Sequence, residues 1–190
     1  MLLLASKSPR RRELLKLLNV DFRIVGGPEV EEVYPADLPV EEVPAFLSSL
    51  KAEAFRPSLS GDDILVTADT VVVLDNEIIG KPSSLEDAKR MLHRLSGRTH
   101  RVITGVSLTS ARKSETFSVV TEVFFAPLTP ADIDFYVDTY KPLDKAGAYG
   151  IQEWIGAVGV EGVRGSFYNV MGLPVHQLYH HLKSFSSTQE

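Results

Sequence analysis

Cations gather in this sequence at the expected start of a helix. The segment Ser6 to Arg12 (SKSPRRR) puts Arg10 and Arg11 into the first helical turn, where the positive end of the helix dipole disfavours them. Free backbone N–H groups at a helix start already attract anions, so a phosphate-rich ligand would explain the added cations. A solvated basic helix start and an SPRR-type nucleic-acid contact are the alternatives.

A carboxylate interrupts the most apolar strand of the sequence. Asp69 lies within Ile64 to Leu74 (ILVTADTVVVL), a β-branched run typical of a central strand covered on both faces. Asp is depleted in strands, and a buried carboxylate without partners is costly. Asp69 is therefore either the structural partner of a buried cation, or a metal ligand or general base.

Three further positions offer groups suited to a nucleotide. Lys81 lies in a Gly-Lys-Pro turn after a strand, and Lys51 lies beside the apolar stripe of an expected helix. Both are also compatible with ordinary surface lysines. Gln152 follows the glycine-rich loop 144–151, and its amide could read a base edge or a carbonyl. A plain connecting loop is the alternative there.

Hard oxygen ligands accompany these cations. The stretch Glu29 to Glu42 holds six carboxylates and no Lys or Arg, and one or two of them could help to hold a divalent ion. A nucleoside triphosphate with Mg²⁺ needs both kinds of group, because the metal bridges phosphate oxygens and protein carboxylates.

Composition restricts the classes of protein. The chain has 190 residues, a formal net charge of −5 and no Cys. The acidic balance argues against a nucleic-acid coat protein, and the lack of Cys excludes disulfides and thiolate metal sites. The N-terminal residues do not follow the order of a signal peptide, and no apolar run approaches 18 residues. We expect a cytoplasmic protein that binds no membrane.

Strand and helix patterns interleave along the chain, which predicts an α/β fold with a mixed sheet. Hairpin signals make the sheet mixed rather than parallel. The expected helices begin after Ser8, near Val40, at a Ser83–Glu86 capping box, at Thr129 and at Pro174. The expected strands are 1–5, 64–74, 77–80, 101–109, 116–125 and 155–163. On the Thr129 helix, Ile133, Val137 and Tyr140 should point inward.

Six motifs follow one another through nearly the whole chain: LASKSPRRRELL at 4–15, TADTVV at 67–72, GKP at 80–82, SGRTHRVITGV at 96–106, PLDKAGAYGIQ at 142–152 and GSFYNVMGLPV at 165–175. In these motifs the sequence resembles the Maf proteins, a family of nucleotide pyrophosphatases. The resemblance implies an elongated twisted α/β fold similar to the inosine triphosphate pyrophosphatases. It also implies that residues 1–190 form one domain of two lobes around a central cleft. Residues 184–190 are expected to be a frayed tail.

The resemblance also implies an activity and its residues. A nucleoside triphosphate is expected to be hydrolysed to the monophosphate and pyrophosphate with Mg²⁺ or Mn²⁺. Asp69 resembles the family's proton acceptor and, with Glu32, its metal ligands, although Glu31 would serve as well as Glu32. The phosphate-binding set by motif position is Ser6, Arg10, Arg11, Lys51 and Lys81.

Substrate choice within the family follows three positions. Arg10, Thr70 and Gln152 match the branch that acts on dTTP and UTP. The sequence therefore predicts a dTTP/UTP pyrophosphatase that makes no stable complex with nucleic acid. The alternatives are a pyrophosphatase for 7-methyl-GTP or modified nucleotides, and a nucleic-acid-binding regulator of cell division. A homodimer is left open by the sequence.

Overall fold

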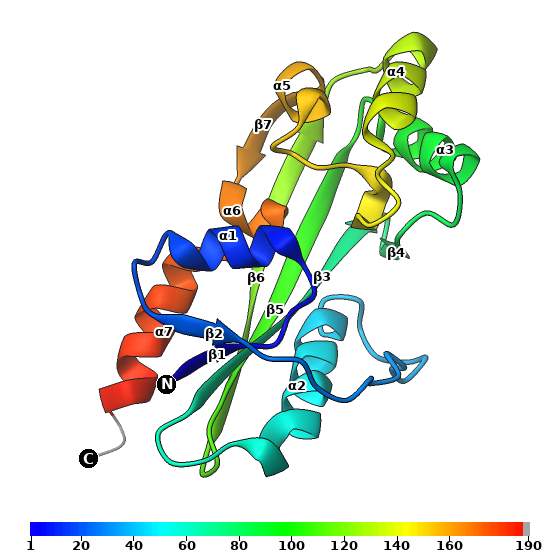
Figure 1. Cartoon of the computed structure of the whole chain (residues 1–190). Helices are drawn as coiled ribbons and strands as arrows, with labels where there is room; N and C mark the ends of the chain where they lie inside the picture. The colour runs from blue at the N-terminus through cyan, green and yellow to red at the C-terminus, as the bar shows by residue number, and fades with distance from the viewer. Residues whose placement is uncertain (188–190) are drawn as a thin grey trace. The chain divides into compact units, whose positions relative to one another are not determined.

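The computed structural model describes residues 1–187, in which strands and helices interleave as the α/β prediction requires (Figure 1). The strands are β1 (Leu2–Leu4), β2 (Phe22–Ile24), β3 (Ile64–Leu74), β4 (Glu77–Ile79), β5 (Thr99–Thr109), β6 (Ser114–Phe125) and β7 (Val160–Arg164). The helices are α1 (Pro9–Lys16), α2 (Val43–Phe55), α3 (Leu85–Leu95), α4 (Pro130–Tyr140), α5 (Trp154–Gly159), α6 (Phe167–Met171) and α7 (Val175–Ser187), with 3₁₀ turns η1 (Arg56–Ser58) and η2 (Ala146–Ala148).

The described strands form one mixed sheet. Its order is β2-β1-β3-β5-β6-β7, and β4 pairs with β3 beside this path. Strand β1 runs parallel to both β2 and β3, whereas β3–β4 and β6–β7 are antiparallel. The predicted mixed sheet with flanking helices is thus confirmed.

The chain divides into two compact units. Unit 1 contains residues 1–69, 104–119 and those from 172 onward, and unit 2 contains residues 70–103 and 120–171. Strands β3, β5 and β6 each contribute residues to both units, so the division of the chain passes between Asp69 and Thr70.

In unit 1, strand β1 leads through a short turn into helix α1. Ser8 has extended backbone angles and its side chain accepts a hydrogen bond from the Arg11 N–H, while Pro9 occupies the first helical turn. This is the favoured chemistry of a helix start. Leu14 and Leu15, on the inner face of α1, are buried at 2% and 0% exposure.

Helix α7 continues further than the sequence indicated. The frayed tail predicted from Ser184 is wrong for residues 184–187, which belong to α7. Phe185 is 2% exposed, and Lys113 Nζ donates to its carbonyl at 2.6 Å and lies over its ring. Phe185 follows the buried Leu178 by seven residues, two helical turns, so both reach the same core. The predicted tail's last residues, 188–190, lie outside the described residues.

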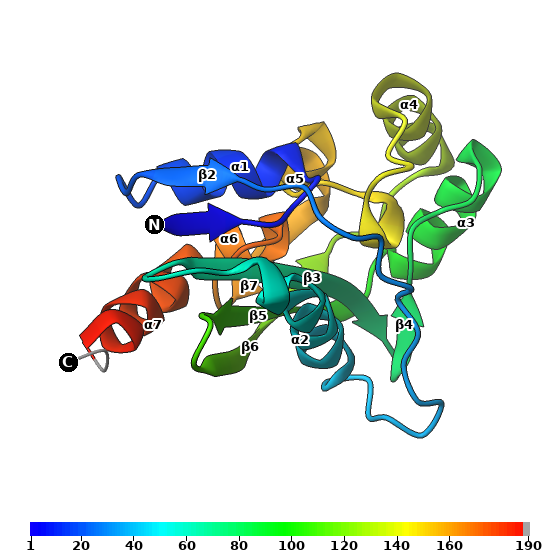
Figure 2. The ribbon, with the colours of Figure 1, turned by 60° about the horizontal axis from the view of Figure 1, so that its bottom comes forward.

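Unit 2 is built around a second apolar core. Helices α3 and α4 pack side by side (Figures 1 and 2), and Leu92, Leu95, Tyr136 and Val137 from these helices are fully buried. Tyr140, which was predicted to point inward, is 38% exposed. Tyr136 takes the inward position, because it is one helical turn from Ile133 and Tyr140 lies at the end of the helix.

Two other local predictions in unit 2 are wrong. Ser84, rather than Ser83, caps α3 by accepting from the Asp87 N–H, and the Asp87 carboxylate in turn accepts from the Ser83 N–H. The run from Ile155 does not form strand throughout: α5 continues to Gly159, and only β7 is extended. A short apolar run with glycines is ambiguous between helix and strand until its packing is known.

Candidate active site

Three predicted site residues lie together in unit 1, where Lys51 contacts both Glu32 and Asp69. The Nζ atom of Lys51, on α2, lies 2.7 Å from Asp69 Oδ1 on β3 and 2.9 Å from Glu32 Oε1. We call Glu32, Lys51 and Asp69 the carboxylate cluster. Of the two glutamates that the sequence left equivalent, Glu32 is the one that contacts Lys51.

The three side chains of the cluster differ in their exposure to solvent. The Asp69 side chain is 13% exposed and that of Lys51 20%, whereas Glu32 is 54% exposed. Glu32 also lies between β2 and α2, outside regular secondary structure. The Lys51 ammonium supplies the positive charge that a largely buried carboxylate such as Asp69 needs as a partner. Among the described residues, the second carboxylate oxygen of Asp69 has no hydrogen-bond partner.

Arg11 belongs to the same electrostatic neighbourhood. Its Nε donates to the carbonyl of Gly172 at 2.8 Å, which directs the guanidinium away from the solvent. Burial lowers the pKa of Arg11 from its usual value, and the positive charge of Arg10 lowers it further. The negative charges of Asp69 and Glu32 act in the opposite direction and raise this pKa. Arg11 therefore lies within electrostatic range of Asp69 and Glu32, the two carboxylates of the cluster, and of Arg10. An Arg remains a cation despite such a shift.

Ser6 occupies the turn between β1 and α1. Its Oγ accepts a hydrogen bond from the backbone N–H of Ser8 at 3.2 Å. Ser8, in turn, caps α1. The two serines therefore shape the turn that presents Arg10 and Arg11, as the strand–turn–helix prediction requires.

The donor set of the cluster suits a hard divalent cation in part. Glu32 and Asp69 already flank one positive charge, the Lys51 ammonium. Within residues 1–187, no three His, Asp or Glu side chains gather as a complete metal site. Mg²⁺ is commonly held by one or two carboxylates together with substrate phosphates and water. Two carboxylates fit that mode and do not fit a metal site made by protein alone.

Lys81 lies in unit 2, directly after β4. Its side chain is exposed, and the preceding Gly80 accepts a hydrogen bond from the Gly147 N–H at 3.0 Å. Gly147 has a φ of 68°, and a β-carbon there would lie 3.0 Å from the Val72 side chain. The lysine turn and the glycine-rich loop are thus neighbours within unit 2.

Gln152 is exposed at the end of that loop, whereas the loop residues before it contact buried polar side chains. The Gly150 N–H donates to the Tyr136 hydroxyl at 3.0 Å, and this hydroxyl donates to Glu153 Oε2. Lys145 Nζ lies 3.2 Å from Glu153 Oε1. We call Tyr136, Lys145 and Glu153 the loop brace.

The electrostatics of the brace keep Tyr136 protonated. Burial raises the pKa of the Tyr136 hydroxyl, and the neighbouring Glu153 carboxylate raises it further. A β-carbon on Gly150 would lie 3.0 Å from Glu153 Oε2 and 3.1 Å from Gln152 Nε2, so a larger residue there would displace these two side chains. The brace fixes the backbone on the N-terminal side of Gln152 and leaves its amide outside.

Residues 1–185 match the model of the family described as Maf-like protein. The chain belongs to the Maf family. None of the helices in residues 1–187 is both long and apolar enough to cross a membrane.

Curated relatives of this Maf-family chain cover it almost completely. A protein of Phocaeicola vulgatus named dTTP/UTP pyrophosphatase is 52% identical over 182 residues, which are 96% of this chain and 94% of the relative. One of the same name from Porphyromonas gingivalis is 50% identical over 189 residues, covering 98% and 95%. The family resemblance noted in the sequence is therefore confirmed.

Solved structures support the fold. The Ham1 protein of Staphylococcus aureus has a TM-score of 0.55 at 18% identity, with 97% of this chain and 98% of that chain covered. A HAM1 protein of Coxiella burnetii has a TM-score of 0.53 at 16% identity, covering 96% and 98%. At such identities the likeness concerns the fold alone.

The predicted site residues thus form two groups in this Maf-family chain. Lys51 contacts both Glu32 and Asp69, and Arg11 interacts electrostatically with Asp69, Glu32 and Arg10. Lys81 and Gln152 lie in unit 2. Thr70 is partly buried in β3 next to Asp69, and successive strand residues point to opposite faces. Thr70 therefore does not share the face of Asp69.

Sequence reasoning missed the loop brace. Glu153 is adjacent to Gln152 and Lys145 lies in the quoted loop, but Tyr136 comes from α4 and carries no motif. Trp154, the first residue of α5, packs edge-on against Phe135 of α4. The signal that could have found Tyr136 is its hydroxyl, since a buried Tyr O–H needs a polar partner.

Proposed function

We propose that this Maf-family chain hydrolyses nucleoside triphosphates, dTTP and UTP in preference, to the monophosphate and pyrophosphate. The observation that carries the proposal is the carboxylate cluster, in which a sheltered Asp69 keeps one oxygen outside its ion pair with Lys51. The names of relatives that are half identical to this chain support the substrate.

Asp69 is the proton acceptor in this proposal. The water oxygen forms a bond to the α-phosphorus while the bond from that phosphorus to the bridging oxygen breaks. The electron pair leaves with pyrophosphate, and the water proton goes to the Asp69 carboxylate. Lys51 holds Asp69 by its ion pair at 2.7 Å, so the carboxylate keeps one orientation before substrate arrives.

The cations are proposed to bind the phosphates. Arg10 and Arg11 follow the capped turn of α1, and Ser6 offers a hydroxyl at the same turn. Lys81 is an exposed ammonium that we assign to phosphates of the same substrate. Charge on the departing pyrophosphate is stabilised by such groups, and phosphoryl transfer depends mainly on positioning and electrostatics.

Glu32 and Asp69 are proposed to hold a divalent cation, Mg²⁺ or Mn²⁺, together with the substrate. Such an ion supplies positive charge to phosphate oxygens when bound. Their shared interaction with the Lys51 ammonium supports this assignment, because the pair already accommodates one cation. Removal of free metal with a chelator should therefore abolish turnover and leave the fold intact.

Gln152 is proposed to choose the base, together with Arg10 and Thr70. An exposed amide on a braced loop offers one donor and one acceptor in a fixed place. Uracil and thymine present a carbonyl beside an N3–H, which matches this pair of groups. Cytosine presents a different order of donors and acceptors and would leave polar groups unpaired.

A nucleotide panel tests the proposal. UTP, dTTP, CTP, GTP, ATP and 7-methyl-GTP are incubated with Mg²⁺ or Mn²⁺, and the products are separated by ion-exchange chromatography. UTP and dTTP should give monophosphate and pyrophosphate fastest. Release of diphosphate and phosphate would contradict the reaction, and fastest turnover of 7-methyl-GTP would contradict the substrate. Absence of hydrolysis with steeply salt-dependent DNA binding would favour the regulator of cell division.

A cytoplasmic location stays a prediction, and a homodimer stays an open assembly. Cell fractionation with an antibody against the chain tests the first. Light scattering on the purified protein tests the second, since a dimer would double the mass of 21.0 kDa.

A further inference from the structure

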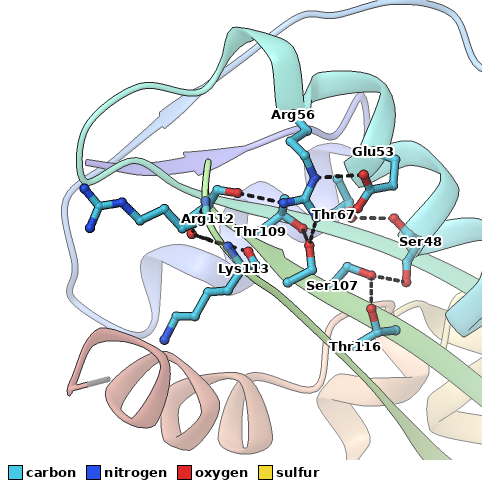
Figure 3. A network of polar contacts seen from close by, with 11 residues as sticks. Ser48, Glu53, Arg56, Thr67, Ser107, Thr109, Arg112, Lys113 and Thr116 are labelled. Atoms are coloured by element: carbon cyan, nitrogen blue, oxygen red, sulfur yellow. Dashed lines mark hydrogen bonds and ion pairs between the residues drawn. The ribbon is translucent and has the colours of Figure 1, made fainter. Parts of the chain in front are cut away.

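Helix α2, which carries Lys51, contacts the strands of unit 1 at three successive positions along one face. From the N-terminal end of the helix, the contacts involve its backbone at Pro44, then Ser48, then Lys51. These positions are three or four residues apart, so they lie along one face of the helix. Figure 3 shows the middle part of this row.

The central contact is a buried hydrogen bond between β3 and α2. The Thr67 hydroxyl donates to the backbone carbonyl of Ser48 at 2.7 Å, and both residues are fully buried. The Ser48 hydroxyl lies 2.9 Å from that of Ser107, which lies 2.8 Å from that of Thr116 (Figure 3). Several strands are thus connected to one turn of the helix.

The first contact is a close approach of the start of α2 to the backbone of β5. A β-carbon on Gly105 would lie 2.3 Å from the backbone carbonyl oxygen of Pro44 and 2.3 Å from the backbone nitrogen of Ala45. Only a glycine allows this backbone of β5 to approach α2 so closely. Backbone packing between β5 and α2 therefore contributes to the position of the helix, independently of the charged side chains.

The hydrogen bond and the ion pair join the same two surfaces. Thr67 and Asp69 are two residues apart in β3 and share a face of the strand, while Ser48 and Lys51 are one turn apart in α2. Thr67 contacts Ser48 at 2.7 Å, and Asp69 contacts Lys51 at 2.7 Å. The two contacts are neighbouring links between one strand and one helix.

We propose that Thr67 is a positioning residue for the reaction: its hydroxyl fixes the turn of α2 from which Lys51 reaches Asp69. The inference rests on the proposed function of Lys51 and Asp69. Thr67 itself touches no reacting atom. Loss of its hydroxyl would let the helix turn move relative to β3, and an error near 1 Å in such a pair can cost about 100-fold in rate.

A purely structural role makes a different prediction. If the Thr67 hydroxyl only stabilises the fold, its removal lowers the melting temperature and leaves the kcat of the folded enzyme unchanged. If it positions Lys51, its effect on kcat depends on the Lys51 ammonium being present. A double-mutant cycle measures this dependence.

The experiment compares Thr67→Val, Lys51→Met and the double variant in UTP hydrolysis, well below each melting temperature. Thr67→Val keeps the size of the side chain and removes only the hydroxyl. It should lower kcat roughly tenfold with KM changed less than about twofold. In the Lys51→Met background, the same substitution should change kcat by less than about twofold. Thr67→Ser restores the hydroxyl and should recover most of kcat.

Thr109→Val is the matched control. Thr109 is also a fully buried threonine of unit 1, but its hydroxyl bonds to Ser114 at 2.9 Å rather than to α2. This variant should lose stability without losing kcat. Equal kcat losses from Thr67→Val in both backgrounds would overturn the positioning role and leave the proposed function standing. A Lys51→Met enzyme with unchanged kcat would overturn the role of Lys51 and, with it, this inference.

Discussion

Two lysines in this molecule each lie between an exposed and a sheltered carboxylate. In unit 1, Lys51 contacts Glu32, 54% exposed, and Asp69, 13% exposed. In unit 2, Lys145 contacts Asp144, 59% exposed, and Glu153, 19% exposed. The charges and their shelter are similar, but the remaining oxygen of the sheltered acid has a different environment.

That difference separates a reacting group from a supporting one. The second oxygen of Glu153 accepts the Tyr136 hydroxyl, which also receives the Gly150 N–H, so the acid is fully engaged. Asp69 has no such second partner among the described residues. An acid with all its partners in place stabilises a loop, whereas an acid with one oxygen available can take up a proton or a metal. Similar ion pairs therefore do not imply similar roles.

The largest expected effect comes from the reacting side of this comparison. Asp69→Asn keeps the volume of the side chain and removes its charge and basicity. The kcat for UTP should fall by about 10² to 10⁴, because a general base contributes on that order. Circular dichroism should show an intact fold. Asp62→Asn, an exposed change in the same unit, is the control. More than about a tenth of wild-type kcat in Asp69→Asn would show that Asp69 is not the base.

Removal of a phosphate-binding cation should have the next largest effect. Lys81→Ala and Arg10→Ala should each cost about 1.5–3 kcal/mol in transition-state stabilisation, since each loses a charge-assisted hydrogen bond. For Lys81→Ala the loss in kcat/KM should be similar for every triphosphate. Arg10→Ala can add some preference among bases. Lys16→Ala removes an equal charge from a surface ion pair and should have little effect. A loss confined to one base would contradict the Lys81 assignment.

On the loop that the brace supports, Gln152→Ala should lower the preference of the enzyme for UTP over CTP. The ratio of kcat/KM for UTP over CTP should fall about tenfold, mainly through slower turnover of UTP, because the uracil groups that are covered in the complex would lose their hydrogen-bond partner, at a cost of roughly 1–3 kcal/mol. Steady-state kinetics with both nucleotides measure this ratio. If the variant slows all nucleotides equally, Gln152 only supports its loop and does not read the base.

The smallest effect should come from the brace itself. Tyr136→Phe removes the hydroxyl between Gly150 and Glu153 and should lower stability by about 1 kcal/mol. The UTP-to-CTP ratio should fall about two- to threefold, since the loop loses order while Gln152 remains. Tyr140→Phe is the control, because Tyr140 stacks on Tyr136 and is 38% exposed. An unchanged ratio in Tyr136→Phe would separate the brace from base choice.

Local patterns allowed much of the fold to be predicted. The strand from Ile64 to Leu74 agrees with β3 in both of its ends, and Ser8 and Pro9 begin α1 as expected. These features depend on side-chain periodicity and on hydrogen bonds between residues a few positions apart. The three-residue strand β2 carried too short a pattern to be predicted, and it exists because it pairs with β1.

The candidate site shows the same division. The residue types and motifs by themselves singled out Asp69, Lys51 and a glutamate near position 32. Only the tertiary structure decided that Lys51 lies between Glu32 and Asp69, and that Tyr136 supports the Gln152 loop. Those contacts join residues 14 to 19 positions apart in the sequence, through packing that no local pattern encodes. The close approach of Gly105 to Pro44 decides where α2 lies, and thereby which carboxylate its lysine can reach.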